Sequence, residues 1–177
     1  MRFQLDLTKE YGIVLEGGGA KGSYQIGAWK ALKEAGLRIR GIAGVSVGSL
    51  NGALICMDDL EKAEYIWENI SYSKVMDIDD GIVETVRRGD LKAVDMKLLA
   101  EEAKKVLKGK GFDITPLRQL IEEAIDEEKI RSSDRELYIT AYSLTDRQLL
   151  TVDAKEVPDG EIGDMLMASA YLPVFKN

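Results

Sequence analysis

Ser46 lies at the centre of the pentapeptide Gly44-Val45-Ser46-Val47-Gly48. A serine flanked in this way by two glycines can sit on a sharp strand-to-helix turn that presents its hydroxyl as a nucleophile. The small flanking residues let the backbone bend without clashes. A glycine-rich turn whose serine only caps a helix would have the same sequence. The elements before and after the pentapeptide therefore matter for the interpretation of Ser46.

A second glycine-rich stretch precedes the serine, from Gly17 through Gly18, Gly19 and Lys21 to Gly22. Such a turn can direct backbone N–H groups at a developing oxyanion. The same residues also match the Gly-x-Gly-x-x-Gly fingerprint of dinucleotide-binding folds, which expects an acidic residue after the second strand. Residues 38–44 contain two arginines and no carboxylate there. An NADP-binding module therefore remains an alternative, whereas a Walker A loop is excluded because Ser23 follows Gly22.

The chain contains no histidine. This absence excludes a Ser-His-Asp triad, a Cys-His pair and a histidine-ligated zinc site. We expect no metal and no cofactor. The acidic residues 77–81 lack the EF-hand spacing that ends in a glutamate, so they are interpreted as a solvated loop. The single cysteine, Cys56, is expected to be buried in the core.

Length and charge limit the remaining function classes. The 177 residues suit one domain, and the formal net charge of −7 argues against a nucleic-acid partner. The N-terminal residues have no apolar core of the kind found in signal peptides, and no apolar run is long enough to span a membrane. A cytoplasmic location is the expectation, and peripheral contact with a membrane through apolar residues stays open.

The pattern of apolar residues predicts an α/β fold. A buried strand over 11–15 is followed by a helix over 23–35 that ends at Gly36, a strand over 39–45 and a helix over 47–57. This βαβα order implies a parallel sheet with helices on both faces. Further elements are expected as helices over 58–69, 96–108, from Thr115 onward and over 161–170, and as strands over 136–144 and 148–152. Residues 70–95 look less regular.

Three segments together resemble the patatin-like phospholipase family. They are the glycine-rich stretch, Gly44-Val-Ser-Val-Gly-Ser-Leu-Asn-Gly-Ala53, and Ala168-Ser-Ala-Tyr-Leu-Pro-Val-Phe175. Residues 113–117 and 137–141 also look like the middle section of that family, and the resemblance extends from residue 11 onward. It implies a three-layer α/β/α fold with a mainly parallel central sheet, a nucleophile elbow after the second strand, and a Ser-Asp dyad that needs no histidine.

The resemblance also implies residue roles. Ser46 would be the nucleophile, and the loop of Gly17, Gly18 and Gly19 would bind the substrate, with the amides of Gly18 and Gly19 as oxyanion donors. Lys21 occupies the basic position of the family's loop. It would stabilise the loop or nearby charge, or be an ordinary solvated lysine. The implied substrate is a fatty-acyl ester or phospholipid, and a non-catalytic lipid-binding or scaffold relative is the alternative.

The chain departs from the family at the dyad aspartate. The resemblance places this residue in an Asp-Gly-Gly or Asp-Gly-Ala motif after the Pro-x-Phe segment, and the sequence ends at Asn177 before any such motif. Asp80-Gly81 and Asp159-Gly160 both precede Pro173 and lack the third residue. We therefore assign no catalytic aspartate. Residues 1–177 are expected to form one domain that lacks its C-terminal part, is inactive alone and can self-associate.

Overall fold

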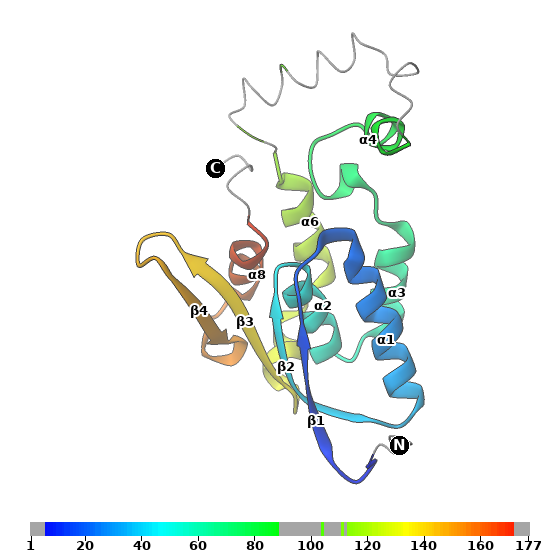
Figure 1. Ribbon diagram of the computed structural model, residues 1–177. Coiled ribbons are helices and arrows are strands. Elements are labelled where there is room, and N and C mark those ends of the chain that lie inside the picture. The colour runs from blue at the N-terminus through cyan, green and yellow to red at the C-terminus, as the bar shows by residue number, and fades with distance from the viewer. Residues whose placement is uncertain (1–5, 89–103, 105–110, 112, 172–177) are drawn as a thin grey trace. The chain divides into compact units, whose positions relative to one another are not determined.

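The computed structural model (Figure 1) describes residues 6–88, 104, 111 and 113–171. These residues divide into two compact units. The first consists of the described parts of residues 1–68 and 124–170, and the second of those of 69–123 together with Tyr171. Ser46 and the glycine-rich stretch both belong to the first unit, which can therefore be considered by itself. The prediction of a single domain stays a prediction.

A four-stranded sheet forms the centre of the first unit. Its strands are β1 (Glu10–Leu15), β2 (Arg38–Val45), β3 (Glu136–Ser143) and β4 (Gln148–Asp153), and they lie in that order. β1–β2 and β2–β3 are parallel, whereas β3 and β4, the two strands predicted over 136–144 and 148–152, form an antiparallel hairpin. The α/β class with a mainly parallel sheet is therefore confirmed.

One face of this sheet is covered by helices. Ile13, Ile42 and Leu137 lie side by side in the register of β1, β2 and β3, and Ile42 and Leu137 are at most 1% exposed. Helix α2 (Val47–Cys56) packs on this face, where Gly52 approaches both of these side chains. Helix α8 (Ile162–Ala170) packs beside β3. On the opposite face, by contrast, Val14 is 85% exposed.

Helix α1 (Gly22–Glu34) ends where the sequence predicts. Gly36 has a φ of 78°, a left-handed conformation that favours glycine. Its N–H donates to Lys33 O, and the N–H of Leu37 donates to Leu32 O, which together satisfy the last carbonyls of the helix. The chain can then turn directly into β2.

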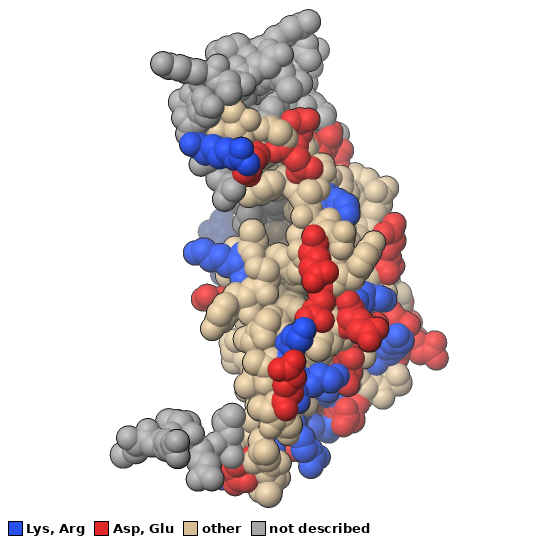
Figure 2. Space-filling model, turned by 90° about the vertical axis from the view of Figure 1, so that its right-hand side faces the viewer, with Lys and Arg blue, Asp and Glu red and all other residues tan. Residues whose placement is uncertain are grey.

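The outer surface of α1 and α3 (Leu60–Asn69) is charged. Figure 2 shows acidic and basic side chains interspersed on the side of the molecule that includes these helices. Lys30 of α1 pairs with Glu64 of α3 at 2.7 Å, and Lys33 pairs with Asp58 at 2.6 Å. The inward side of α1 buries Ile26 and Trp29, as their spacing predicts.

The second unit corrects one prediction. Residues 77–79 form a loop as expected, but Asp80 and Gly81 begin helix α4 (Asp80–Arg87). The Asp80 carboxylate accepts hydrogen bonds from the N–H and hydroxyl of Ser73 at 2.9 and 2.6 Å. An acidic group in a first turn also favours a helix start. Helix α6 (Thr115–Ala124) is confirmed, and the helix predicted over 96–108 lies outside the described residues apart from Lys104.

Helix α7 (Glu127–Ser132) was not predicted. It starts at Asp126, whose carboxylate accepts from the N–H of Lys129 at 3.1 Å and so caps the helix. The described residues also include three short 3-10 helices, over Gly19–Lys21, Tyr72–Lys74 and Ala154–Glu156. Over the described ranges, no helix combines the length and the apolar character that crossing a bilayer requires.

Candidate active site

Ser46 occupies the turn between β2 and α2, directly after Val45 and directly before Val47. Its φ of 55° and ψ of −128° are angles that residues other than glycine rarely adopt. Such strain is typical of functional positions and persists only where the surroundings enforce it. The strand–turn–helix context that the sequence required for a nucleophile turn is therefore present.

The two glycines of the pentapeptide are required by packing. A Cβ atom on Gly44 would lie 2.4 Å from the carbonyl oxygen of Gly48, and one on Gly48 would lie 2.2 Å from the carbonyl oxygen of Leu15. Both distances are far below van der Waals contact. The start of α2 therefore packs backbone against backbone on the ends of β1 and β2, and this close approach holds Ser46 in place.

The glycine loop, residues 17–22, passes beside Ser46. A Cβ atom on Gly17 would lie 3.3 Å from Ser46 Cβ and 3.9 Å from Ser46 Oγ. Gly18 and Gly19 have φ values of 152° and 56°, which fit glycine and strain other residues. Two motifs that are separated in sequence thus meet at one point, as they must if both act on the same carbonyl group.

Hydrogen-bonding groups remain available at this point. Within the described residues, the N–H groups of Gly18 and Gly19 donate no hydrogen bond, and neither does the half-exposed hydroxyl of Ser46. The positive end of the α2 dipole lies at Ser46 and favours negative charge. Attack on a carbonyl carbon requires a nucleophile such as this hydroxyl. Stabilisation of the resulting oxyanion requires donors such as free amides and a helix N-terminus.

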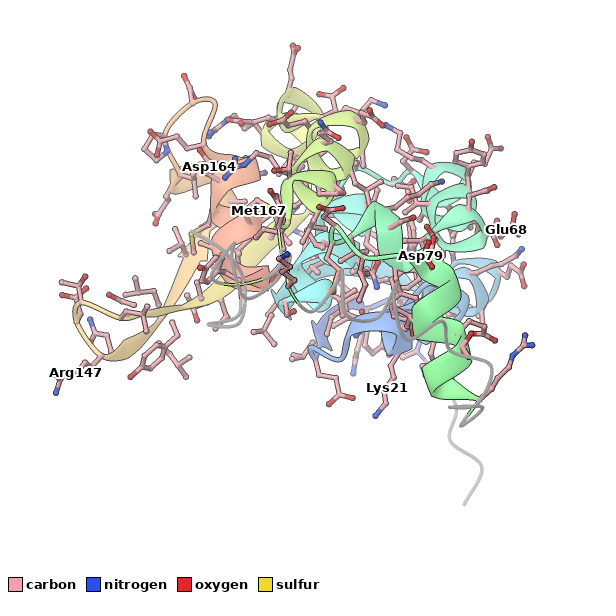
Figure 3. All side chains as sticks on the ribbon, turned by 90° about the horizontal axis from the view of Figure 1, so that it is seen from above. Lys21, Glu68, Asp79, Arg147, Asp164 and Met167 are labelled. Atoms are coloured by element: carbon pink, nitrogen blue, oxygen red, sulfur yellow. The ribbon has the colours of Figure 1, made fainter. Side chains whose placement is uncertain are left out.

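Lys21 has an exposed side chain at the start of α1. Figure 3 shows it pointing away from the ribbon. Only its stem is near the loop, since a Cβ atom on Gly18 would lie 3.5 Å from Lys21 Cβ. Of the roles considered for Lys21, this position favours a solvated lysine or packing of its stem against the loop.

The loop is fixed by two amide side chains that the sequence reasoning missed. Asn51 Nδ2 donates to Gly22 O at 2.9 Å and to Gln25 Oε1 at 2.8 Å, and Gln25 Nε2 donates to Glu16 O at 2.8 Å. We call Gln25 and Asn51 the amide clamp. Trp67 Nε1, which can only donate, binds Asn51 Oδ1 at 2.9 Å and so sets the orientation of that amide. The clamp holds both ends of the glycine loop.

Ser49 and Ser169 were also missed. Both are buried, and their hydroxyl oxygens lie 2.9 Å apart. The backbone N–H of Ser46 donates to Ser169 Oγ at 2.9 Å. One signal could have revealed these residues together with Asn51, because each is a polar residue within a run of small or apolar helical residues. Such residues are buried only when they have hydrogen-bonding partners.

Within the described residues, no carboxylate accepts a hydrogen bond from Ser46 Oγ. Asp159, in one of the two Asp-Gly dipeptides, has a side chain that is 99% exposed, and it pairs with Arg131 at 3.5 Å. Asp80, in the other, accepts hydrogen bonds from Ser73. The catalytic aspartate stays unassigned.

Other residues have roles that do not require chemistry. Cys56 is 1% exposed, as predicted, and burial raises the pKa of its thiol. In the NADP alternative, the two arginines of residues 38–44 would bind a 2′-phosphate. In the structure Arg38 pairs with Glu10 at 2.7 Å, and Arg40 pairs with Glu136 at 3.8 Å. Over the ranges that the structure describes, no group of histidine, cysteine or acidic residues could hold a metal ion.

Comparison with solved structures supports the fold. VipD from Legionella pneumophila superimposes with a TM-score of 0.57 and 16% sequence identity, over 94% of this chain and 43% of VipD. At this identity the similarity concerns the fold alone.

Comparison with known sequences identifies the family. Neuropathy target esterase sws of Drosophila sechellia is 53% identical over 47 residues, which are 27% of this chain and 3% of that protein. Lysophospholipase nte1 of Aspergillus terreus is 52% identical over 50 residues, which are 28% of this chain and 3% of that protein. The matched segment thus spans a small part of these relatives. The family model of patatin-like phospholipases, however, matches residues 13–176. The chain belongs to the patatin-like phospholipase family.

Proposed function

We propose that this chain carries the nucleophile and the oxyanion loop of a serine acyl hydrolase that acts on lipid esters. The observation that carries the proposal is the conformation of Ser46, a strained serine between strand and helix with the glycine loop against its side chain. Membership of a phospholipase family supports the lipid substrate. The names of two relatives, an esterase and a lysophospholipase, point to the same class of carboxylic ester.

The proposed reaction begins when Ser46 Oγ attacks the acyl carbonyl carbon of a fatty-acyl ester or phospholipid. The hydroxyl proton passes to a general base, and the carbonyl oxygen becomes an oxyanion that accepts hydrogen bonds from the Gly18 and Gly19 amides. Collapse of this intermediate breaks the ester bond. The leaving alcohol takes up the proton, and an acyl-serine remains. Water then attacks the acyl-serine and releases the fatty acid.

The general base is unassigned, since no carboxylate among the described residues accepts a hydrogen bond from Ser46 Oγ. By resemblance it is an aspartate, whose pKa burial would raise toward the working pH. A lipid substrate also implies contact with a membrane or lipid aggregate at its surface, and we propose no nucleic-acid partner. A non-catalytic lipid-binding protein is the second candidate, because Ser46 Oγ has no hydrogen-bonding partner within the described residues.

Fluorophosphonate labelling tests the proposal, because these probes react with activated serine hydroxyls. The natural protein that carries these 177 residues is expected to be labelled, and peptide mass spectrometry should place the label on Ser46. The Ser46→Ala variant should not be labelled, whereas Ser23→Ala, an exposed serine of α1, should be labelled like the wild type. Labelling that survives in Ser46→Ala would refute the assignment. A folded wild-type protein without any label would support the non-catalytic candidate.

A further inference from the structure

The backbone of Ser46 is held by a hydrogen bond from a distant part of the chain. Ser46 precedes α2 and follows the last residue of β2, and its N–H donates to the side chain of Ser169 in α8 at 2.9 Å. The two residues are 123 positions apart. A strained backbone persists only where its surroundings over-determine it, so this hydrogen bond is a restraint on the strained residue itself.

The hydroxyl of Ser169 uses all of its hydrogen-bonding capacity. A serine hydroxyl has one proton to donate and two lone pairs that accept. Ser169 Oγ lies 2.6 Å from Thr140 O, and a carbonyl oxygen can only accept, so the Ser169 proton is committed to β3. Ser169 Oγ then accepts from Ser46 N–H and from Ser49 Oγ, both at 2.9 Å. The direction of every hydrogen bond is fixed.

Ser169 and Ser49 are shielded from solvent. Ser169 is 8% exposed and Ser49 is fully buried. Removing the Ser169 hydroxyl would leave the Ser46 N–H and the Thr140 carbonyl without this partner at a largely buried position. An unsatisfied buried group of this kind costs more than the net value of the hydrogen bond it has lost.

We propose that Ser169 is a positioning residue for Ser46. It joins β3, α2 and α8 to the strained turn, and it thereby fixes the direction in which the Ser46 Cα–Cβ bond points. This direction matters because Ser46 Oγ must face the glycine loop, in which Gly17 lies beside the Ser46 side chain. The catalytic part of this inference depends on the proposed function of Ser46, whereas the restraint on the backbone does not.

Ser49 provides a matched control. It is buried in the same place and donates to Ser169, but its side chain makes no hydrogen bond to Ser46. Ser49→Ala removes one hydrogen bond of the cluster and leaves the one between Ser46 N–H and Ser169 Oγ intact. Ser169→Ala also loses the hydrogen bond to Thr140 O, so it should lower the unfolding free energy more than Ser49→Ala does. A role of Ser169 in stability alone would leave the reactivity of Ser46 in the folded variant unchanged, whereas a role in positioning lowers it.

The test compares wild type, Ser169→Ala and Ser49→Ala of the natural protein by two readouts. The first is the second-order rate constant of fluorophosphonate labelling at Ser46. We expect Ser169→Ala to lower it by about tenfold or more and Ser49→Ala by less than about threefold. The second is hydrogen exchange of the Ser46 backbone N–H, followed by NMR with ¹⁵N-serine. Its protection should fall by about tenfold in Ser169→Ala only.

The outcomes test positioning by Ser169, the restraint on the Ser46 backbone and the proposed function separately. Equal labelling rates in the two alanine variants, with both folded, would overturn positioning by Ser169. Unchanged exchange of the Ser46 N–H in Ser169→Ala would overturn the restraint itself. A wild type that takes no label would refute the proposed function, and the exchange measurement would still decide whether Ser169 holds the turn.

Discussion

Ser46 has backbone angles that glycine adopts at lower cost. For residues other than glycine, such a conformation destabilises the fold by about 1–3 kcal/mol. The chain nevertheless has serine there, while Gly44 and Gly48 on either side have no room for a Cβ atom. A position that would be more stable as glycine but is occupied by a residue with a hydroxyl is more easily explained by chemistry than by packing.

This strain can be measured with two substitutions. Ser46→Ala keeps a Cβ atom and the strain, whereas Ser46→Gly removes both. We expect Ser46→Gly to exceed Ser46→Ala in unfolding free energy by about 1 kcal/mol, after the greater freedom of glycine in the unfolded chain has offset part of the gain. Urea unfolding of both variants measures the difference. A glycine variant that is no more stable than the alanine variant would show that Ser46 is not strained.

The candidate site was predictable from the sequence only where its residues are neighbours in the chain. Ser46 with its glycines, and the glycine loop, each form a short motif, so their local geometry could be inferred. Ser169 contacts Ser46 across 123 positions, and Gln25 contacts Asn51 across 26. No local pattern encodes such pairings. The only local sign is a polar residue that has to be buried, and it does not reveal the partner.

At the scale of elements, β1, α1, β2 and α2 were predicted within one or two residues of their observed ends. Their apolar runs are bounded by glycines with clear conformational roles, such as Gly36 at the end of α1. Helices α4 and α7 were not predicted, because side chains of acidic residues determine their starts. Asp80 binds Ser73 and Asp126 binds Lys129, and these contacts do not show in the apolar periodicity.

The amide clamp makes the glycine loop depend on α1, α2 and α3. Asn51 is 1% exposed, so Asn51→Leu would leave the half-buried Trp67 Nε1 without its acceptor and remove the hydrogen bond to Gly22 O. We expect this variant to lose about 2 kcal/mol or more of unfolding free energy. Gln25 is only half-buried, and Gln25→Ala should lose less than about 1 kcal/mol.

Both clamp variants should also slow labelling of Ser46, because the loop amides would no longer be held beside it. Ser132→Ala is a control away from the loop, since Ser132 is exposed and its hydroxyl donates only to the Glu128 and Lys129 carbonyls of α7. Its stability and labelling rate should equal those of the wild type. If Gln25→Ala is labelled as fast as Ser132→Ala, the clamp does not contribute to the site.

At the scale of the whole molecule, the segment that leads into α8 carries a charge network. Glu127 of α7 accepts hydrogen bonds from the N–H groups of Gly160 and Ile162 at 2.8 and 3.4 Å. Arg131 bonds to the same carboxylate and also donates to the carbonyls of Val157 and Pro158. This network holds the start of the helix that carries Ser169, so it links the stability of the fold to the candidate site.

The ionisation of Glu127 therefore affects stability. Burial raises the pKa of its carboxyl group. Hydrogen bonds from the Gly160 N–H and from Arg131 lower this pKa by more than burial raises it, so the net result is a pKa below the ordinary value. A carboxyl whose pKa is lower in the folded state stabilises the fold above the unfolded-state pKa. This stabilisation is lost as the pH falls through the folded-state pKa, because the folded protein must then take up a proton at a site built for the anion.

Glu127→Gln tests this link across the acid range. The variant should be less stable than the wild type at pH 7 by about 1 kcal/mol, and the gap should close as the pH falls below about 4. Urea unfolding at pH 7, 5, 4 and 3 measures it. Glu128→Gln is the control, since Glu128 is the next residue of α7 and is exposed, and it should follow the wild type at every pH. A gap between Glu127→Gln and the wild type that stays constant from pH 7 to pH 3 would show that Glu127 acts through packing and not through its charge.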